Sequence, residues 1–207
     1  VYISLDNKSN FLKKSNDNNL KILPTIYDIN KNILAYSDYN YSIIDNKNKF
    51  KYIKRDASLN DIQESIYIGN PFIKFEKILT RKYPYSSLTN NLIGHTNIDH
   101  RGISLLEKYV DTNETEIEIS MDIQIQRKIY DSLNKDTANL NPDYAMSVLV
   151  DLSSEEIVSN VFLDNRSIED QFDKTLLPIK DLKFDFGSVF KTFTVFSALK
   201  NEKIELN

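Results

Sequence analysis

The sequence predicts a mixed α+β fold, and three stretches carry this prediction. Residues 71–79 alternate apolar and polar side chains in the manner of a half-buried strand. Residues 122–134 place isoleucine and leucine at helical spacing, with Asp122 near the start as a helix cap. Two apolar stretches, 145–150 and 157–162, flank a turn at 153–156 and therefore predict a β-hairpin.

Shorter elements surround these three. The remaining strand signals cover residues 22–35 on either side of a turn at 28–32, part of a mainly looped stretch at 38–48, and 114–120. Helical patterns cover residues 56–68 with Ser58 as a cap, 88–94 up to a glycine, 102–109, and part of a polar loop at 164–183. The most favourable domain boundary lies near Ser120.

Composition narrows the classes of function. The 207 residues are 41% hydrophobic and 27% charged, which are the values of a globular protein. A net charge of −4 without a basic patch gives no support for nucleic-acid binding. The lack of cysteine excludes disulfides and thiol chemistry, and two histidines are too few for most histidine metal sites. No apolar run approaches the roughly 18 residues of a membrane span, and because the sequence starts in mid-pattern we expect it to be part of a longer protein.

One apolar stretch near the C-terminus contains the strongest candidate for chemistry. Residues 186–199 carry apolar side chains around nearly the whole helical circumference, which predicts a buried helix. Gly187 permits a tight turn just before Ser188, and Lys191 follows three positions later on the same helical face. Burial would favour a neutral lysine amine, which could accept the proton of the serine hydroxyl. We therefore predict Ser188 as a nucleophile and Lys191 as its general base.

An ordinary structural interpretation of this pair stays open. The spacing S-x-x-K also occurs at Ser132 and Lys135 and at Ser197 and Lys200, so the spacing alone is a weak signal. A core helix with a capping serine and a lysine that extends to solvent would show the same pattern. The pair that begins at Ser188 differs in lying at the start of the apolar run.

Seven short motifs follow one another along the chain. They are I-Y-D-I-N-K-N-I-L-A from Ile26, R-K-Y-P from Arg81, L-I-G from Leu92, G-I-S-L-L-E-K-Y-V-D from Gly102, I-S-M-D-I-Q-I-Q from Ile119, the hairpin at 145–159, and residues 184–199 around Ser188. In this order they resemble the class B penicillin-binding proteins, the peptidoglycan transpeptidases of bacterial division or elongation. The R-x-Y-P motif and the helix around Ser188 favour the cell-division branch.

The resemblance implies an architecture and a reaction. Residues 1–120 would form an elongated, β-rich pedestal and dimerisation domain, and residues 121–207 the N-terminal part of a transpeptidase domain whose sheet packs on the serine helix. Ser188 would attack the penultimate D-alanine of a peptidoglycan stem peptide, with Lys191 as the base and without a metal or cofactor. The same serine would be acylated by β-lactams.

The resemblance also implies a location and partners. The protein would lie at the periplasmic face of the cytoplasmic membrane, anchored by an N-terminal helix that is not in this sequence. Its partners would be stem peptides, β-lactams, a membrane glycosyltransferase and other cell-wall synthesis proteins. The resemblance is also compatible with a homodimer. Arg81 and Glu107 are interpreted as a structural ion pair of the pedestal, and Tyr83 and Tyr85 as packing residues.

The sequence departs from the family pattern mainly at turns. Lys31, Leu105 and Glu155 stand where the family has glycine, and Phe186 stands where it has proline. The S-x-N and K-S/T-G motifs, which would wall the site, do not follow Lys191 within residues 192–207. We therefore expect altered turns and an incomplete active site.

Two other functions stay open. The chain could be a non-catalytic pedestal or interaction module, which the missing motifs favour. It could also be a serine β-lactamase or β-lactam sensor, which shares S-x-x-K, although such proteins lack the pedestal-like segments before Ser120.

Overall fold

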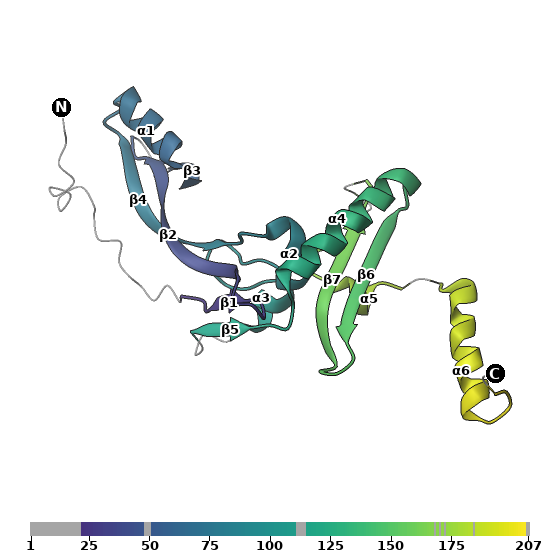
Figure 1. The fold of residues 1–207 in the computed structure, drawn as a ribbon. Coiled ribbons are helices and arrows are strands. Elements are labelled where there is room, and N and C mark those ends of the chain that lie inside the picture. The colour runs from purple at the N-terminus through teal and green to yellow at the C-terminus, as the bar shows by residue number, and fades with distance from the viewer. Residues whose placement is uncertain are drawn as a thin grey trace.

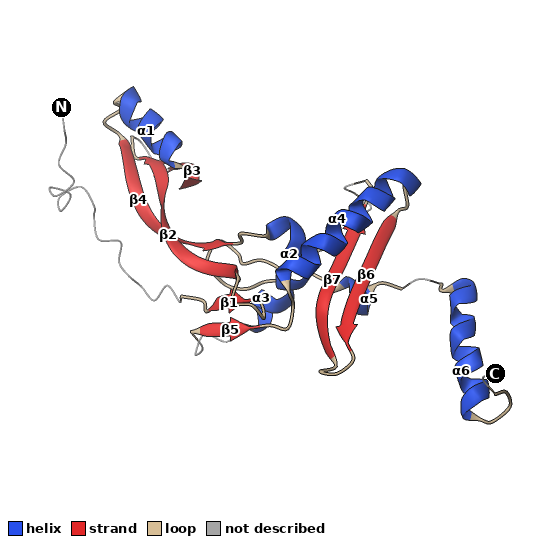
Figure 2. Cartoon of the chain, in the orientation of Figure 1, coloured by secondary structure: helices blue, strands red, loops and turns tan. Residues whose placement is uncertain are grey.

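The computed structural model describes residues 22–47, 51–110, 115–167, 169, 171, 173–183 and 185–205. Over these ranges the chain is an elongated α+β molecule, as predicted, with a strand-rich arm at one end and a separate helix at the other (Figure 1). Figure 2 shows that the strands fall into two groups. The first 21 residues of the predicted pedestal lie outside the described part.

The larger group is a five-stranded sheet with the order β3-β2-β1-β5, in which β4 also pairs with β2. Its strands are β1 (Thr25–Tyr27), β2 (Ile33–Asp45), β3 (Lys51–Ala57), β4 (Ile73–Lys82) and β5 (Glu116–Glu118). Strands β1 and β5 are parallel, and the other neighbours are antiparallel. The prediction of mainly loop at 38–48 was wrong, because β2 runs through most of this stretch. It pairs with β4 from Tyr36–Lys82 to Asp45–Ile73, and this long pairing outweighs the weak local pattern.

The smaller group is the predicted hairpin of β6 (Tyr144–Asp151) and β7 (Glu156–Asp164). The long helix α4 (Ile123–Leu140) packs against both strands. Gln126 fixes this arrangement from a fully buried position. Its amide nitrogen donates to the carbonyls of Leu88 and Asn160, and its amide oxygen accepts from the Ser159 hydroxyl and the Asn160 N–H. One side chain therefore joins α4, β7 and the helix that contains Leu88.

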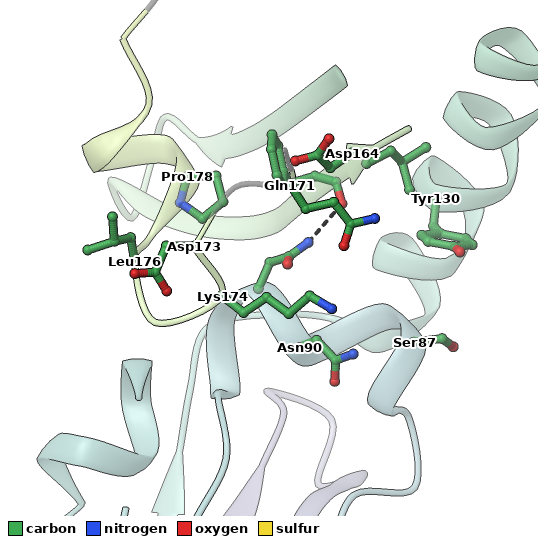
Figure 3. A pocket seen from close by; sticks show the side chains of 12 residues that line it. Ser87, Asn90, Tyr130, Asp164, Gln171, Asp173, Lys174, Leu176 and Pro178 are labelled. Atoms are coloured by element: carbon green, nitrogen blue, oxygen red, sulfur yellow. Dashed lines mark hydrogen bonds between the residues drawn. The ribbon is translucent and has the colours of Figure 1, made fainter. Parts of the chain in front are cut away.

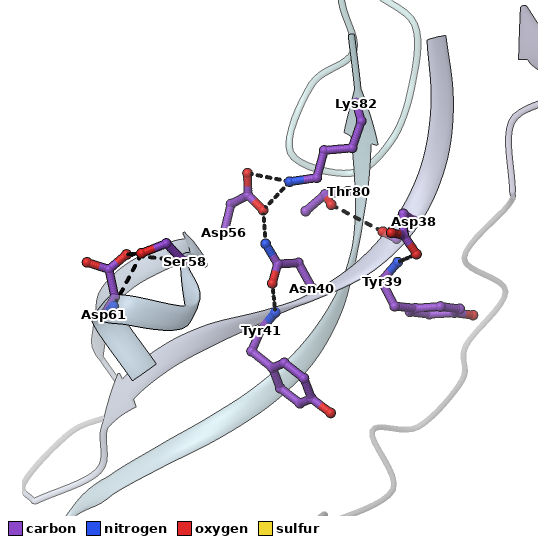
Figure 4. Close-up of polar contacts among 9 residues, drawn as sticks. All are labelled: Asp38, Tyr39, Asn40, Tyr41, Asp56, Ser58, Asp61, Thr80 and Lys82. Atoms are coloured by element: carbon purple, nitrogen blue, oxygen red, sulfur yellow. Dashed lines mark hydrogen bonds and ion pairs between the residues drawn. The ribbon is translucent and has the colours of Figure 1, made fainter. Parts of the chain in front are cut away.

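Five further helices complete the described fold. They are α1 (Leu59–Ile68), α2 (Ser86–Ile93), α3 (Leu105–Tyr109), α5 (Pro178–Asp181) and α6 (Lys191–Lys200), with a 3-10 turn at Gly187–Phe190 just before α6. The predicted cap of α1 is confirmed: Ser58 and Asp61 form a reciprocal capping box (Figure 4). Hydrogen bonds from Lys54 and Ser58 lower the pKa of Asp61 to about 2, so the cap's contribution is complete above pH 3.8 and is lost as the pH falls through about 2.

The apolar core lies where β1, β2, α2 and the start of α4 meet. Its fully buried members are Ile26, Leu34, Ala35, Ile93, Met121 and Ile123. Tyr83 and Tyr85 pack against this cluster, as predicted. Because Met121 and Ile123 share a core with Ile26, packing continues across position 120, near which the sequence predicted a domain boundary.

Two glycines of the chain are required by close packing, whereas three positions at which the sequence resemblance leads us to expect glycine carry other residues. A Cβ on Gly94 would lie 2.3 Å from the Ser104 carbonyl oxygen, and one on Gly102 would lie 1.8 Å from that of Glu107. These two positions admit only glycine. At Lys31, Leu105 and Glu155, where the family has glycine, φ is 64°, 46° and 61°. These three residues thus adopt the left-handed backbone conformation, which costs each of them roughly 1–2 kcal/mol of conformational free energy.

Replacing two of these non-glycine residues with glycine is expected to stabilise the protein. Lys31→Gly and Glu155→Gly should each raise the free energy of unfolding by about 0.5–1 kcal/mol, because relief of the positive φ exceeds the entropy that glycine adds to the unfolded chain. This corresponds to a rise in Tm of about 1–4 °C in thermal denaturation. Lys31→Ala and Glu155→Ala are the matched controls, since they remove the side chain and keep the strain. An equal gain in the alanine variants would show that the side chains, rather than the backbone, are responsible.

Candidate active site

Ser188 and Lys191 lie on one turn at the start of the last helix. Gly187 opens the turn with φ of 52°, and no atom lies within 4 Å of the place where its Cβ would be. Glycine is therefore favoured there by conformation alone. The Lys191 N–H donates to the Ser188 carbonyl, which closes the turn. Residues three apart in a 3-10 turn eclipse one another, so the two side chains share a face, as predicted.

The two side chains border the same surface groove on this helix. Its other lining residues are Thr192, Val195, Phe196 and Leu199. The structure records no hydrogen bond between the Ser188 hydroxyl and the Lys191 amine, both of which belong to the described residues. Among the described residues, no acceptor is recorded for the Ser188 N–H, and this is the group that would face a developing oxyanion. The turn thus holds a nucleophile, an amine and one N–H donor close together.

The prediction that this helix is buried was wrong for the described structure. No residue of α6 is buried, and Phe193 and Phe196 are 61% and 62% exposed. The predicted packing of the sheet on the serine helix is also not seen: α6 extends away from β6 and β7 (Figure 1), and of the described elements it packs mainly on its own preceding turn. Its side-chain pattern is that of a core helix, but the described elements do not supply a covering surface. The burial on which Lys191's role as a base depends is therefore absent here.

The other S-x-x-K pairs lie in different surroundings. Ser132 and Lys135 are within the solvent-facing part of α4, and Ser197 and Lys200 are in the last turn of α6. Of these, Ser197 accepts a hydrogen bond on its carbonyl oxygen from the Asn201 side chain. Neither serine follows a left-handed glycine turn, so the structure separates Ser188 from both.

Arg81 and Glu107 form the ion pair that the sequence suggested. The Arg81 Nε lies 2.8 Å from a Glu107 carboxylate oxygen, and the two side chains are 1% and 0% exposed. Arg81 also donates to the Leu23 carbonyl and the Ser37 hydroxyl. The pair joins β4 to α3 in the pedestal-like region, and it does not contact Ser188 or Lys191. Its position supports a structural role.

A second buried carboxylate, that of Asp28, was not predicted from the sequence. Asp28 in the β1–β2 turn is 0% exposed and accepts from the N–H groups of Asn30, Asn32 and Ile123 and from the Asn32 side chain. Burial opposes ionisation, but these four donors together outweigh it and hold the pKa of Asp28 below its ordinary value. The turn itself was predicted, because Asp and Asn favour turns. Nothing in the local pattern indicated that Asp28 also binds the start of α4.

Asp122 caps α4, as predicted, by accepting from the N–H groups of Gln124 and Ile125. It also accepts from the Asn30 side chain at 2.8 Å. The β1–β2 turn and the α4 N-terminus are therefore joined by two carboxylates, Asp28 and Asp122. This junction connects the sheet to the part of the chain that leads to Ser188.

Within the described residues, no cluster of three or more metal-ligating side chains is present. Nor does any described helix combine the length and hydrophobicity that crossing a bilayer requires.

Comparisons with known proteins agree with the architecture. No protein-family model matches the sequence. The peptidoglycan D,D-transpeptidase FtsI of Buchnera aphidicola subsp. Baizongia pistaciae is 26% identical over 174 residues, which cover 67% of this chain and 29% of that protein. The crystal structure of a peptidoglycan synthetase from Bifidobacterium adolescentis matches with a TM-score of 0.60 and 14% identity, covering 90% of this chain and 51% of the other.

Fold, motif order and sequence similarity therefore agree that the chain is similar to part of a class B penicillin-binding protein. Within that class it is a distant homologue of FtsI. It spans less than a third of the length of the curated relative that it matches.

Proposed function

We propose that this chain belongs to a peptidoglycan D,D-transpeptidase that cross-links stem peptides through an acyl-enzyme on Ser188. The observation that carries the proposal is the turn that places Ser188, its backbone N–H and Lys191 together after a left-handed glycine. The similarity to FtsI supports a role in cell-wall synthesis and a location in the cell envelope. Within cell-wall synthesis, we propose a transpeptidase of the cell-division type. Stem peptides, β-lactams and a membrane glycosyltransferase are the proposed partners.

The proposed reaction has two steps. The Ser188 hydroxyl attacks the carbonyl of the penultimate D-alanine, and Lys191 takes its proton and delivers it to the departing D-alanine amine. The Ser188 N–H stabilises the oxyanion of the intermediate. An amine of a neighbouring stem peptide then attacks the ester, which forms the cross-link and returns the proton to Ser188. No cofactor takes part in either step.

The test is intact-mass spectrometry of the whole chain after incubation with benzylpenicillin. Ring opening releases no fragment, so acylation should add the mass of the entire penicillin. The adduct should disappear in Ser188→Ala and persist in Ser197→Ala, the matched serine of the second S-x-x-K in the same helix. Lys191→Ala should slow acylation by about 10²–10⁴-fold, the usual contribution of a general base. An adduct that survives Ser188→Ala would contradict the assignment of the nucleophile.

The exposure of α6 favours a second candidate function for this chain, a pedestal or interaction module with an incomplete active site. On this alternative, a chain that is folded by circular dichroism would give no penicillin adduct at all. The same experiment therefore decides between the two functions.

A further inference from the structure

A polar pocket lies at the junction of α2, α4 and the segment that follows β7, and Ser188 does not line it. Its volume is about 200 Å³. Ser87 and Asn90 lie one turn apart on α2, Tyr130 comes from α4, and Lys174 comes from the segment before α5 (Figure 3). Leu163 and Leu176 add apolar surface to the walls.

The walls of this pocket are tied together by hydrogen bonds. The Asn91 side chain donates to the Phe162 carbonyl at 2.7 Å, which fixes α2 to β7. Pro178 is buried at the start of α5, and the Leu177 N–H donates to Asp181 at 2.8 Å. The wall between α2 and β7 is therefore held by the protein itself, which reduces the entropy lost on binding.

The charges around the pocket are unequally satisfied. Asp164 binds the Arg166 guanidinium through both of its oxygens, at 2.9 and 2.7 Å. Asp173 accepts from the Thr175 N–H and hydroxyl, at 2.8 and 2.7 Å. By contrast, Lys174 has no ion-pair partner in the part of the chain that the structure describes. Within the described residues, Asp164 is thus ion-paired and Asp173 is hydrogen-bonded to neutral groups, while the Lys174 ammonium has neither kind of partner.

Three uncharged polar side chains of the pocket have no recorded partner among the described residues. The side chains of Ser87, Asn90 and Tyr130 make no hydrogen bond with any other described residue. In Figure 3, Lys174 extends above Asn90 along α2. The Asn91 and Gln171 amides of the lining donate to backbone carbonyls, which leaves one cation, the Asn90 amide and two hydroxyls to match a carboxylate next to a peptide group.

We propose that this pocket binds the C-terminal residue of a peptide through its carboxylate. One ammonium balances the single charge of a carboxylate better than the two charges of a phosphate. Asn90, Ser87 and Tyr130 can bind the adjacent peptide group, and Leu163 and Leu176 can contact a small side chain. The volume is below the 300–1,000 Å³ typical of pockets for larger ligands, which suits one residue. The proposal does not depend on the chemistry of Ser188.

The test uses the complete chain and two probes, N-acetyl-alanine and its amide, in ligand-observed NMR titrations. The acid should bind and the amide should bind at least fivefold more weakly, because the amide lacks the charge. Lys174→Gln should weaken binding of the acid at least fivefold. Lys180→Gln, which removes an equal charge on α5, is the matched control and should leave binding unchanged. Asn90→Ala should weaken both probes, since it removes the contact to the peptide group.

Two further arms identify the ligand and separate this site from the catalytic one. Inorganic phosphate should compete more weakly than the acid, and stronger competition would replace the peptide with a phosphate ligand. Ser188→Ala should bind the acid as the natural sequence does, so a failure of the transpeptidase proposal leaves this result intact. Equal binding of acid and amide, or equal loss in Lys174→Gln and Lys180→Gln, would overturn the proposal.

Discussion

Glu107→Gln is expected to lower the free energy of unfolding by about 3–5 kcal/mol, the usual effect of removing one partner of a buried ion pair. Glutamine has nearly the shape of glutamate, so little of the effect arises from a cavity. The loss comes from the Arg81 guanidinium, which stays enclosed without a counter-charge. Urea denaturation followed by circular dichroism measures the change.

Two companion variants test this explanation. Glu118→Gln removes a carboxylate from the exposed pair with Lys31, whose side chains are 45% and 66% exposed, and should cost at most about 1 kcal/mol. Arg81→Met combined with Glu107→Leu removes both charges and should be less destabilising than Glu107→Gln alone. If the double variant were the less stable protein, the pair would contribute through its hydrogen bonds and shape rather than through charge compensation.

Asp28→Asn should be nearly as damaging, with an expected loss of about 2–4 kcal/mol. Asparagine has one accepting oxygen in place of two, and its NH₂ group would face the N–H donors that Asp28 now binds. Because Ile123 begins α4, the variant should also loosen the junction between the sheet and that helix. Amide hydrogen exchange should increase first in the β1–β2 turn and at the start of α4.

The same carboxylate predicts a dependence of stability on pH. The pKa of Asp28 is lower in the folded protein than the ordinary value of 3.8, so the folded state binds fewer protons near that pH. Its contribution is complete above pH 3.8 and is lost as the pH falls through the folded pKa. Thermal denaturation between pH 7 and pH 3 should therefore show a smaller acid-induced loss in Asp28→Asn. Asp151→Asn, at the exposed end of β6, is the control and should change stability much less.

The sequence predicted local features well and long-range features less well. The capping box at Ser58, the Asp122 cap and the β6–β7 hairpin depend on residues close together in the chain, and all three are present. The full length of β2 was missed because it depends on pairing with β4, about forty residues away. Asp28 and Gln126 were missed as junction residues for the same reason: their partners lie up to 95 positions away.

At the candidate site too, local features could be predicted from the sequence and long-range features could not. Ser188, Lys191 and the glycine turn could be found from spacing, and the structure places them on one turn. Burial of the helix could not be predicted from its composition, because burial depends on what covers the helix. The apolar pattern around Phe193 and Phe196 predicted a buried helix, but the described elements leave these side chains exposed.

Because the described elements leave α6 without a covering surface, the reactivity proposed for Ser188 depends on the fraction of molecules in which this helix is formed. A helix of ten residues without tertiary packing is only partly formed in water, so the turn that aligns Ser188 with Lys191 exists in a fraction of the molecules. Under the proposed transpeptidase function, the apparent rate of acylation would scale with that fraction. Any surface that packs on Phe193 and Phe196 raises the fraction without touching the serine, and the reactivity of Ser188 thereby reports how completely its helix is covered.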